Sequence, residues 1–326
     1  MRLFALGGSR DLGSAVAQAL GGALDPHEER DFEDGEHKAR TLVGVRGEDV
    51  YVLHGLAGDD AASANDRLVK LLFFLAACRE NGARQVTAIV PFLAYSRKDR
   101  QTKARDPVTT RYVAELFEAV GTSRLVTVDV HNFAAFQNAF RCETVHLDTR
   151  RLFAPVIARM AGGRPVTVLS PDGGGVKRAQ LLKERLEADT DLKVGFGFLE
   201  KRRSRGVVSG DLFAGDVAGT AVFIVDDMIS TGGTMLRAAT ACRERGATAV
   251  HALAAHGLFA AGADALFASD AIDRIVVTDS VAAAARAQAR HPAARIDIVS
   301  VAPLIGAAIE CLAGGGSISD LLGMES

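Results

Sequence analysis

Short apolar runs alternate with longer amphipathic stretches along the whole chain, and this alternation constrains the fold more than any other feature. Leu3–Gly7, Val50–Gly55 and Gln85–Phe92 are three such runs, and segments with the apolar spacing of helices separate them. Strands that alternate with helices form βαβ units, in which the strands lie parallel and the helices cover the sheet. The sequence therefore predicts an α/β protein with mainly parallel sheets flanked by helices.

The second half of the chain repeats this pattern. Its apolar runs lie in Pro165–Asp172, Gly195–Lys201, Val222–Asp227 and the later segments AVHALAAHG, AIDRIVVTDS and RIDIVSV. A chain of 326 residues is long for a single core, and two domains of about 150 residues each are the expected division. We place the boundary near Leu147–Pro155, which gives an N-terminal domain over 1–148 and a C-terminal domain over 149–305.

The composition argues against two classes of partner. A net charge of -2 does not suit a nucleic-acid binder that depends on bulk positive charge, and the absence of Trp disfavours base-stacking platforms. The most apolar run, Leu71–Cys78, is far shorter than the ~20 residues that span a bilayer. The N-terminus reaches glycine too soon for a signal peptide, and the four dispersed cysteines suit reduced thiols. We expect a cytoplasmic protein without nucleic-acid or membrane partners.

The strongest local signal is VFIVDDMISTGGTM, from Val222 to Met235. Asp226 and Asp227 are expected at the end of a buried strand, where carboxylates can hold ribose hydroxyls directly or through Mg²⁺. A loop that turns into a helix N-terminus follows, and its amides and hydroxyls suit a phosphate. The loop consists of Ser230, Thr231, Gly232, Gly233 and Thr234. The alternative is a plain strand–loop–helix junction capped by Ser230 or Thr231.

This stretch resembles the PRPP-binding motif of type I phosphoribosyltransferases, which implies a 5-phosphorylated ribose as ligand. The motif alone does not separate a base transferase from an enzyme that makes PRPP. Six further motifs are FEDGE (Phe32–Glu36), PFLAYSRKDR (Pro91–Arg100), VDVH (Val128–His131), SPDGGGVKRA (Ser170–Ala179), EKRR (Glu200–Arg203) and AAHGLF (Ala254–Phe259). In this order they resemble the ribose-phosphate pyrophosphokinase (PRPP synthetase) family, from about Leu3 to the C-terminal SISDLL.

The resemblance implies a fold, an activity and an assembly. The fold would be two similar type I phosphoribosyltransferase-like domains, with the C-terminal segment 306–326 joined to the N-terminal domain. The activity would transfer the diphosphoryl group of ATP to the anomeric hydroxyl of ribose 5-phosphate, giving PRPP and AMP, with Mg²⁺ as cofactor. The assembly would be a homo-oligomer, a hexamer built from dimers.

The resemblance also implies roles for particular residues. The ATP-binding residues would be Phe32, Asp34 and Glu36, which reach the adenine from a neighbouring subunit, and Arg97, Lys98 and Asp99. The five loop residues above, with Asp226 and Asp227, would bind the sugar phosphate. His131 and Asp172 would be Mg²⁺ ligands, and Lys201 and Arg203 would be catalytic residues on a mobile loop. Since the chain has no P-loop sequence, side chains and Mg²⁺ must neutralise the triphosphate.

Several positions depart from the family pattern. Lys98 replaces a common glutamine, and Ser230 replaces the aspartate that is usual in synthetases. Gly44 and the segment 131–150 differ in regions that the family uses for phosphate activation and ADP inhibition, so the resemblance implies catalysis but leaves that regulation open. Two alternatives stay open, namely a phosphoribosyltransferase that consumes PRPP and a non-catalytic protein associated with a true synthetase.

Overall fold

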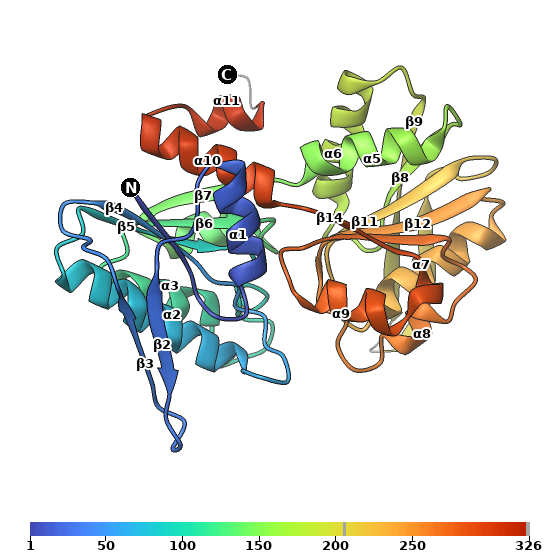
Figure 1. The fold of residues 1–326 in the computed structure, drawn as a ribbon. Helices are drawn as coiled ribbons and strands as arrows, with labels where there is room; N and C mark the ends of the chain where they lie inside the picture. The colour runs from blue at the N-terminus through green and yellow to red at the C-terminus, as the bar shows by residue number, and fades with distance from the viewer. Residues whose placement is uncertain (205–206, 324–326) are drawn as a thin grey trace. The chain divides into compact units, whose positions relative to one another are not determined.

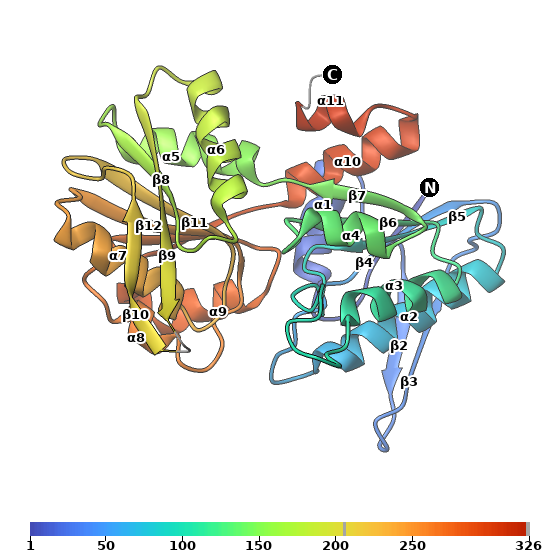
Figure 2. The ribbon, with the colours of Figure 1, turned by 180° about the vertical axis from the view of Figure 1, so that it is seen from behind.

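The structure, a computed structural model, describes residues 1–204 and 207–323, without the side chains of 201–211. The chain divides into two compact units (Figures 1 and 2). Unit 1 contains Met1–Asp148, Ser280–Ala282 and the chain from Ser300 onward. Unit 2 contains Thr149–Asp279 and Ala283–Val299.

Unit 1 is built on a five-stranded parallel sheet in the order β1-β4-β5-β6-β7. The strands are β1 (Arg2–Ala5), β4 (Asp49–Leu53), β5 (Gln85–Val90), β6 (Arg124–Val128) and β7 (Glu143–Leu147). The helices are α1 (Arg10–Ala19), α2 (Ala64–Glu80), α3 (Thr109–Ala119), α4 (Phe133–Ala139), α10 (Ala302–Gly314) and α11 (Ile318–Leu322). Apolar side chains of α2, α3 and α4 pack in one core with the strands, while α10 packs against α1. The predicted α/β class is confirmed.

Helix α2 shows how local sequence sets an element's ends. Ser63 is its N-cap and accepts a hydrogen bond from the amide of Asp66, whose carboxylate accepts one from the amide of Ser63. The helix ends at Asn81, and Gly82 follows with a φ of +88°, as the Asn-Gly pair predicted. Among the described residues no helix, α2 included, is long and apolar enough to cross a membrane.

A separate antiparallel hairpin of unit 1 was not predicted. Its strands are β2 (His27–Asp31) and β3 (His37–Thr41), and Figure 1 shows it projecting from the rest of that unit. Both strands are rich in charged residues and have no fully buried position, so they lack the apolar alternation that indicates a strand. The FEDGE segment is the turn that joins them, closed by a hydrogen bond from the amide of Phe32 to the carbonyl of Glu36.

Unit 2 is built on a seven-stranded sheet in the order β10-β9-β8-β11-β12-β13-β14, parallel except for β10. Its strands are β8 (Val166–Ser170), β9 (Val194–Ser204), β10 (Val207–Ala214), β11 (Ala221–Ile229), β12 (Ala249–Gly257), β13 (Arg274–Thr278) and β14 (Ile296–Val299). Its helices are α5 (Arg150–Ala161), α6 (Val176–Asp189), α7 (Gly233–Glu244), α8 (Asp264–Phe267), α9 (Ala283–Arg290) and the 3-10 turn Pro292–Ala294. Two apolar cores, one with α5 and α6 and one with α7, α8 and α9, bury the sheet.

Candidate functional site

The two adjacent carboxylates lie on β11. We predicted them at the end of the strand, and this is wrong, because β11 continues to Ile229 and stays paired with β12 as far as Gly257. Pairing with β8 on the other side stops at Ile224. Beyond that residue β11 no longer pairs with β8, so Asp226 and Asp227 still lie at the carboxyl edge of the sheet.

The acidic pair is held in a confined environment. Asp227 is 2% exposed, and the Oδ1 of Asp226 accepts a hydrogen bond of 2.9 Å from the amide of Asp227. Arg178 of α6 places a guanidinium nitrogen 3.6 Å from a carboxylate oxygen of each. Burial, and then the neighbouring carboxylate, raise the pKa of Asp226 to about 8. Both causes favour the protonated form of Asp226, and a bound cation would favour its ionised form.

The loop after β11 begins a helix without a side-chain cap. The N-cap of α7 is Gly232, with a φ of +77°, rather than Ser230 or Thr231 as in the alternative interpretation. A Cβ atom on Gly232 would lie 2.8 Å from Leu266 of α8, so both backbone conformation and packing require glycine. In the part of the chain that the structure describes, no side-chain cap closes the N-terminus of α7, which suits its amides to a phosphate.

The predicted metal ligands belong to different units. Asp172 follows β8 in unit 2, and its Oδ1 accepts hydrogen bonds from the amides of Gly174 (2.8 Å) and Gly175 (3.2 Å). His131 follows β6 in unit 1 and is exposed. Over the residues that the structure describes, no three His, Cys, Asp or Glu side chains gather as a metal cluster. Carboxylate oxygens suit Mg²⁺ better than imidazole does, so Asp172 fits the ion well and His131 less so.

The predicted nucleotide residues of unit 1 lie on two loops. Arg97, Lys98 and Asp99 follow β5, and the Oδ2 of Asp99 accepts a 2.6 Å hydrogen bond from the side-chain amide of Asn132. The Nζ of Lys98 donates to a carboxylate oxygen of Asp106 at 2.7 Å. The amide and the hydroxyl of Thr110 both donate to the carbonyl of Lys98, which ties this loop to α3.

The other nucleotide residues lie in the hairpin turn. Asp34 and Glu36 are exposed, and the guanidinium of Arg30 lies 4.9 Å from the centre of the half-buried Phe32 ring. Within unit 1, no described hydrogen bond or ion pair joins this turn to 97–99. The structure therefore does not bring the two predicted parts of the ATP site together within one subunit.

Lys201 and Arg203 belong to strand β9, which forms a hairpin with β10 (Figure 2). The backbone of Lys201 pairs with Asp211 of β10, and that of Arg203 pairs with Val208. We predicted a mobile loop here, but the strand continues to Ser204 because β10 folds back on it as a hairpin. The side chains of both residues lie outside the part of the chain that the structure describes. Their catalytic role stays a prediction.

Sequence reasoning missed three side chains. Each of them contacts a predicted site residue. Arg178 contacts the carboxylate pair, Asp106 contacts Lys98, and Asn132 contacts Asp99. Arg178 lies in the quoted SPDGGGVKRA motif, in the first turn of α6, but nothing in the sequence says which strand that turn faces. Such partners come from tertiary packing rather than from spacing.

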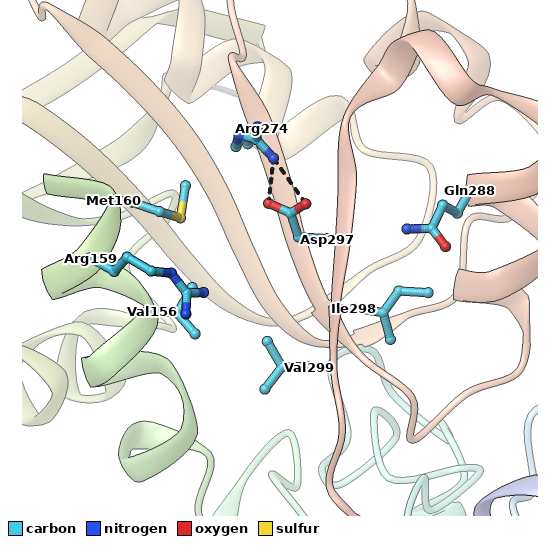
Figure 3. A pocket seen from close by; sticks show the side chains of 8 residues that line it. All are labelled: Val156, Arg159, Met160, Arg274, Gln288, Asp297, Ile298 and Val299. Carbon is cyan, nitrogen blue, oxygen red and sulfur yellow. Dashed lines mark hydrogen bonds and ion pairs between the residues drawn. The ribbon is translucent and has the colours of Figure 1, made fainter.

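A pocket of about 620 Å³ lies elsewhere in unit 2. Figure 3 shows the ion pair between Arg274 and Asp297, with Arg159 of α5 and Gln288 of α9 on either side. None of the predicted site residues lines this pocket. The site is therefore located by the chemistry at the carboxyl edge of β11 and not by this cavity.

Two mainly parallel sheets flanked by helices, one carrying an acidic pair before a glycine-rich loop, define a phosphoribosyltransferase-like α/β protein. The family described as the N-terminal domain of ribose phosphate pyrophosphokinase matches residues 1–121, and the phosphoribosyl synthetase-associated domain matches 211–323. The chain belongs to the ribose-phosphate pyrophosphokinase family.

Individual relatives match over nearly the whole length. Ribose-phosphate pyrophosphokinase of Hyphomonas neptunium is 34% identical over 322 residues, which cover 98% of this chain and 99% of the relative. The Brucella melitensis protein of the same name is 36% identical, with 98% and 99% covered. The crystal structure of phosphoribosylpyrophosphate synthetase from Mycobacterium smegmatis superimposes with a TM-score of 0.85 at 29% identity, covering 97% of this chain and 99% of that one.

Proposed function

We propose that this chain is a Mg²⁺-dependent ribose-phosphate pyrophosphokinase that transfers the diphosphoryl group of ATP to ribose 5-phosphate. The observation that carries the proposal is the acidic pair on β11 with the uncapped α7 N-terminus after it, in a chain that matches pyrophosphokinases from end to end. We further propose that it works in the cytoplasm as a homo-oligomer, a hexamer built from dimers.

The sugar phosphate is assigned to unit 2. The hydroxyls of Ser230, Thr231 and Thr234 and the first amides of α7 would bind the 5-phosphate, since the helix dipole favours a dianion there. Asp226 and Asp227 would accept hydrogen bonds from the ribose hydroxyls, and Arg178 limits the charge of the pair. A buried polar environment of this kind orients the sugar before reaction.

The nucleotide is assigned to residues of unit 1. Arg97 and Lys98 would bind the triphosphate, with Asp99 held by Asn132, and Phe32 would pack on the adenine of a neighbouring subunit with Asp34 and Glu36. Asp172 and His131 would hold Mg²⁺, which when bound neutralises charge on the phosphates. Bringing two polyanionic substrates together requires such neutralisation.

The reaction is an in-line displacement at the β-phosphorus. The anomeric oxygen forms a bond to that phosphorus, its proton is lost to solvent, and the bond from the β-phosphorus to the bridging oxygen of the α-phosphate breaks. AMP leaves with that electron pair, so no covalent enzyme intermediate is needed. Lys201 and Arg203 would stabilise the charge that develops on the transferred group, at roughly 10²–10³ in rate for each donor.

The test is an assay with purified protein, ATP, ribose 5-phosphate and Mg²⁺, scored for AMP and PRPP by anion-exchange chromatography. We expect equal amounts of both products, lost in Lys201→Ala and kept in Lys193→Ala, an exposed lysine just before β9. PRPP consumption in the presence of a base, without AMP formation, would instead identify a phosphoribosyltransferase. No turnover, with co-purification of an active synthetase, would identify the associated protein.

A further inference from the structure

One carboxylate organises the loop that carries the proposed triphosphate cations. The Oδ2 of Asp106 accepts a hydrogen bond from the Nζ of Lys98 at 2.7 Å and from the hydroxyl of Thr102 at 2.7 Å. The same oxygen accepts from the amides of Thr102 (3.2 Å) and Lys103 (3.0 Å). Asp106 therefore closes the 102–106 turn and binds the lysine through one atom.

The lysine is fixed at both ends. Thr110 donates two hydrogen bonds to its carbonyl, while Asp106 and the Thr102 hydroxyl, at 3.2 Å, bind its ammonium group. The side chains of Lys98 and Asp106 are 35% and 23% exposed, so water screens the pair only in part. The hydrogen bond from Lys98, followed by that from Thr102, holds the pKa of Asp106 well below its ordinary value, so the carboxylate is charged at any physiological pH.

The pair has two opposing effects on a nearby polyanion. The ammonium group attracts phosphate, and the carboxylate, one hydrogen bond away, repels it and competes for the same donor. Together the two side chains add no net charge to the loop. Removing either partner alone would leave an uncompensated charge of known sign, whereas removing both would leave none.

We propose that Asp106 is a positioning residue that sets the affinity for the nucleotide triphosphate by holding, and partly neutralising, Lys98. This inference rests on the proposed function, because it takes Lys98 to face ATP. The inference predicts epistasis between the two positions. A substitution of Lys98 alone raises KM for ATP, a substitution of Asp106 alone lowers it, and the double variant has the KM of the parent.

The test is a double-mutant cycle measured as KM and kcat at varied ATP. In Lys98→Gln the carboxylate repels the phosphates unopposed, and we expect KM to rise about tenfold. In Asp106→Asn the amide oxygen can still accept the two backbone hydrogen bonds, and the freed ammonium lowers KM about threefold. Independent effects of about ten up and three down would give the double variant a roughly threefold rise in KM, whereas we expect it to return to the parent value, and Asp106→Glu should keep the parent value.

Glu115→Gln is the matched control. It removes the same charge from an exposed ion pair with Arg111 on α3 in the same unit, and we expect KM to change less than about twofold. Equal melting temperatures for the variants would show that the turn is kept. Additive changes in KM, or a rise in KM in Asp106→Asn, would overturn the inference.

The two proposals fail in different ways. A parent protein that forms no AMP and shows no ATP binding by titration calorimetry defeats the proposed function itself. An active parent with an additive cycle leaves that function intact and defeats only the role of Asp106. Raising the salt concentration should shrink the epistasis in an active enzyme, because the effect is electrostatic.

Discussion

The proposed sugar-phosphate region of unit 2 and the proposed nucleotide region of unit 1 differ in how their side chains are held. Asp226 and Asp227 are part of a central strand paired on one side throughout, and Gly232 is locked by Leu266. Arg97, Lys98 and Asp99 lie on a connecting loop, where single side chains, Asp106 and Asn132, hold the side chains of Lys98 and Asp99.

Because of this difference, the charged side chains of the two regions carry different desolvation penalties. The strand-borne carboxylates are placed by the sheet and carry a desolvation penalty, visible in the raised pKa of Asp226. The loop-borne cations are exposed or partly exposed and carry a smaller desolvation penalty, and Lys98 is held in place by its ion pair with Asp106. Variants in unit 2 should therefore trade activity against stability, whereas variants in the unit 1 loops should change binding alone.

The largest effect is expected for Asp226→Asn. The asparagine cannot accept ribose hydroxyls or a cation as a carboxylate does, and we expect kcat/KM to fall roughly 10²–10³-fold. Stability should change in the opposite direction. Since the folded-state pKa is raised from 3.8 to about 8, folding loses stability as pH rises through that interval. The variant avoids this loss.

The measurement is the melting temperature of parent and variant from pH 3 to pH 9. The two should agree best near pH 3, where the carboxyl group is mostly protonated in both folded and unfolded chains, and the variant should melt higher at pH 8 and above. A variant that melts lower than the parent at pH 8 would show that the charged pair stabilises the fold. The carboxylates of unit 2 would then carry no net stability penalty, and the proposed difference from the loops of unit 1 would be wrong.

The second effect concerns Gly232→Ala. A left-handed backbone costs about 1 kcal/mol for alanine, and contact with Leu266 at 2.8 Å adds about 1–3 kcal/mol of overpacking. Gly246→Ala is the control, since it has a similar φ of +84° but its nearest contact lies at 3.9 Å. Denaturant unfolding should show the larger loss for Gly232→Ala, with a raised KM for ribose 5-phosphate. Equal losses would mean that packing against α8 does not fix the loop.

How far the strands are buried also determines which of them the sequence could predict. The strand and helix pattern predicted nearly every strand of both sheets, because buried parallel strands read as apolar runs. Strand β7 (Glu143–Leu147) was missed because charged and polar residues interrupt it, and the β2–β3 hairpin was missed for the same reason. Strand β10 (Val207–Ala214) was missed because the segment after Glu200 was interpreted as a mobile loop. Apolar periodicity reports burial, so elements that bury little escape it.

The sequence predicted those site residues that belong to recognisable motifs. The acidic pair and its loop were found from their spacing, but the end of β11 was misplaced, since pairing with β12 continues past the carboxylates. Arg178 and Asp106 were missed because their contacts depend on which helix or turn faces which strand. Tertiary packing, not local sequence, decides those contacts.

The third effect, on the hairpin turn, tests the exposed region. In Phe32→Ala the loss of a stacking ring should raise KM for ATP roughly tenfold, with kcat unchanged at saturation. The melting temperature should stay within about one degree, because the ring lies beside Arg30 in the turn of a charged hairpin with no fully buried position in its strands. A variant with unchanged KM but lower stability would make Phe32 an anchor of the hairpin and separate the turn from the nucleotide.

The smallest effect is expected for Ser63→Ala, which removes the N-cap of α2 far from the loop residues in sequence. The amide of Asp66 loses its acceptor, and we expect a loss of about 1 kcal/mol in the free energy of unfolding. Catalytic constants per folded molecule should not change, since Tyr95 keeps its hydrogen bond to Asn65 in the first turn of α2 and Lys98 keeps its ion pair with Asp106. A change in KM for ATP without a loss of stability would show that α2 and the 97–106 loop are coupled, and the loops of unit 1 would then depend on their scaffold as closely as those of unit 2.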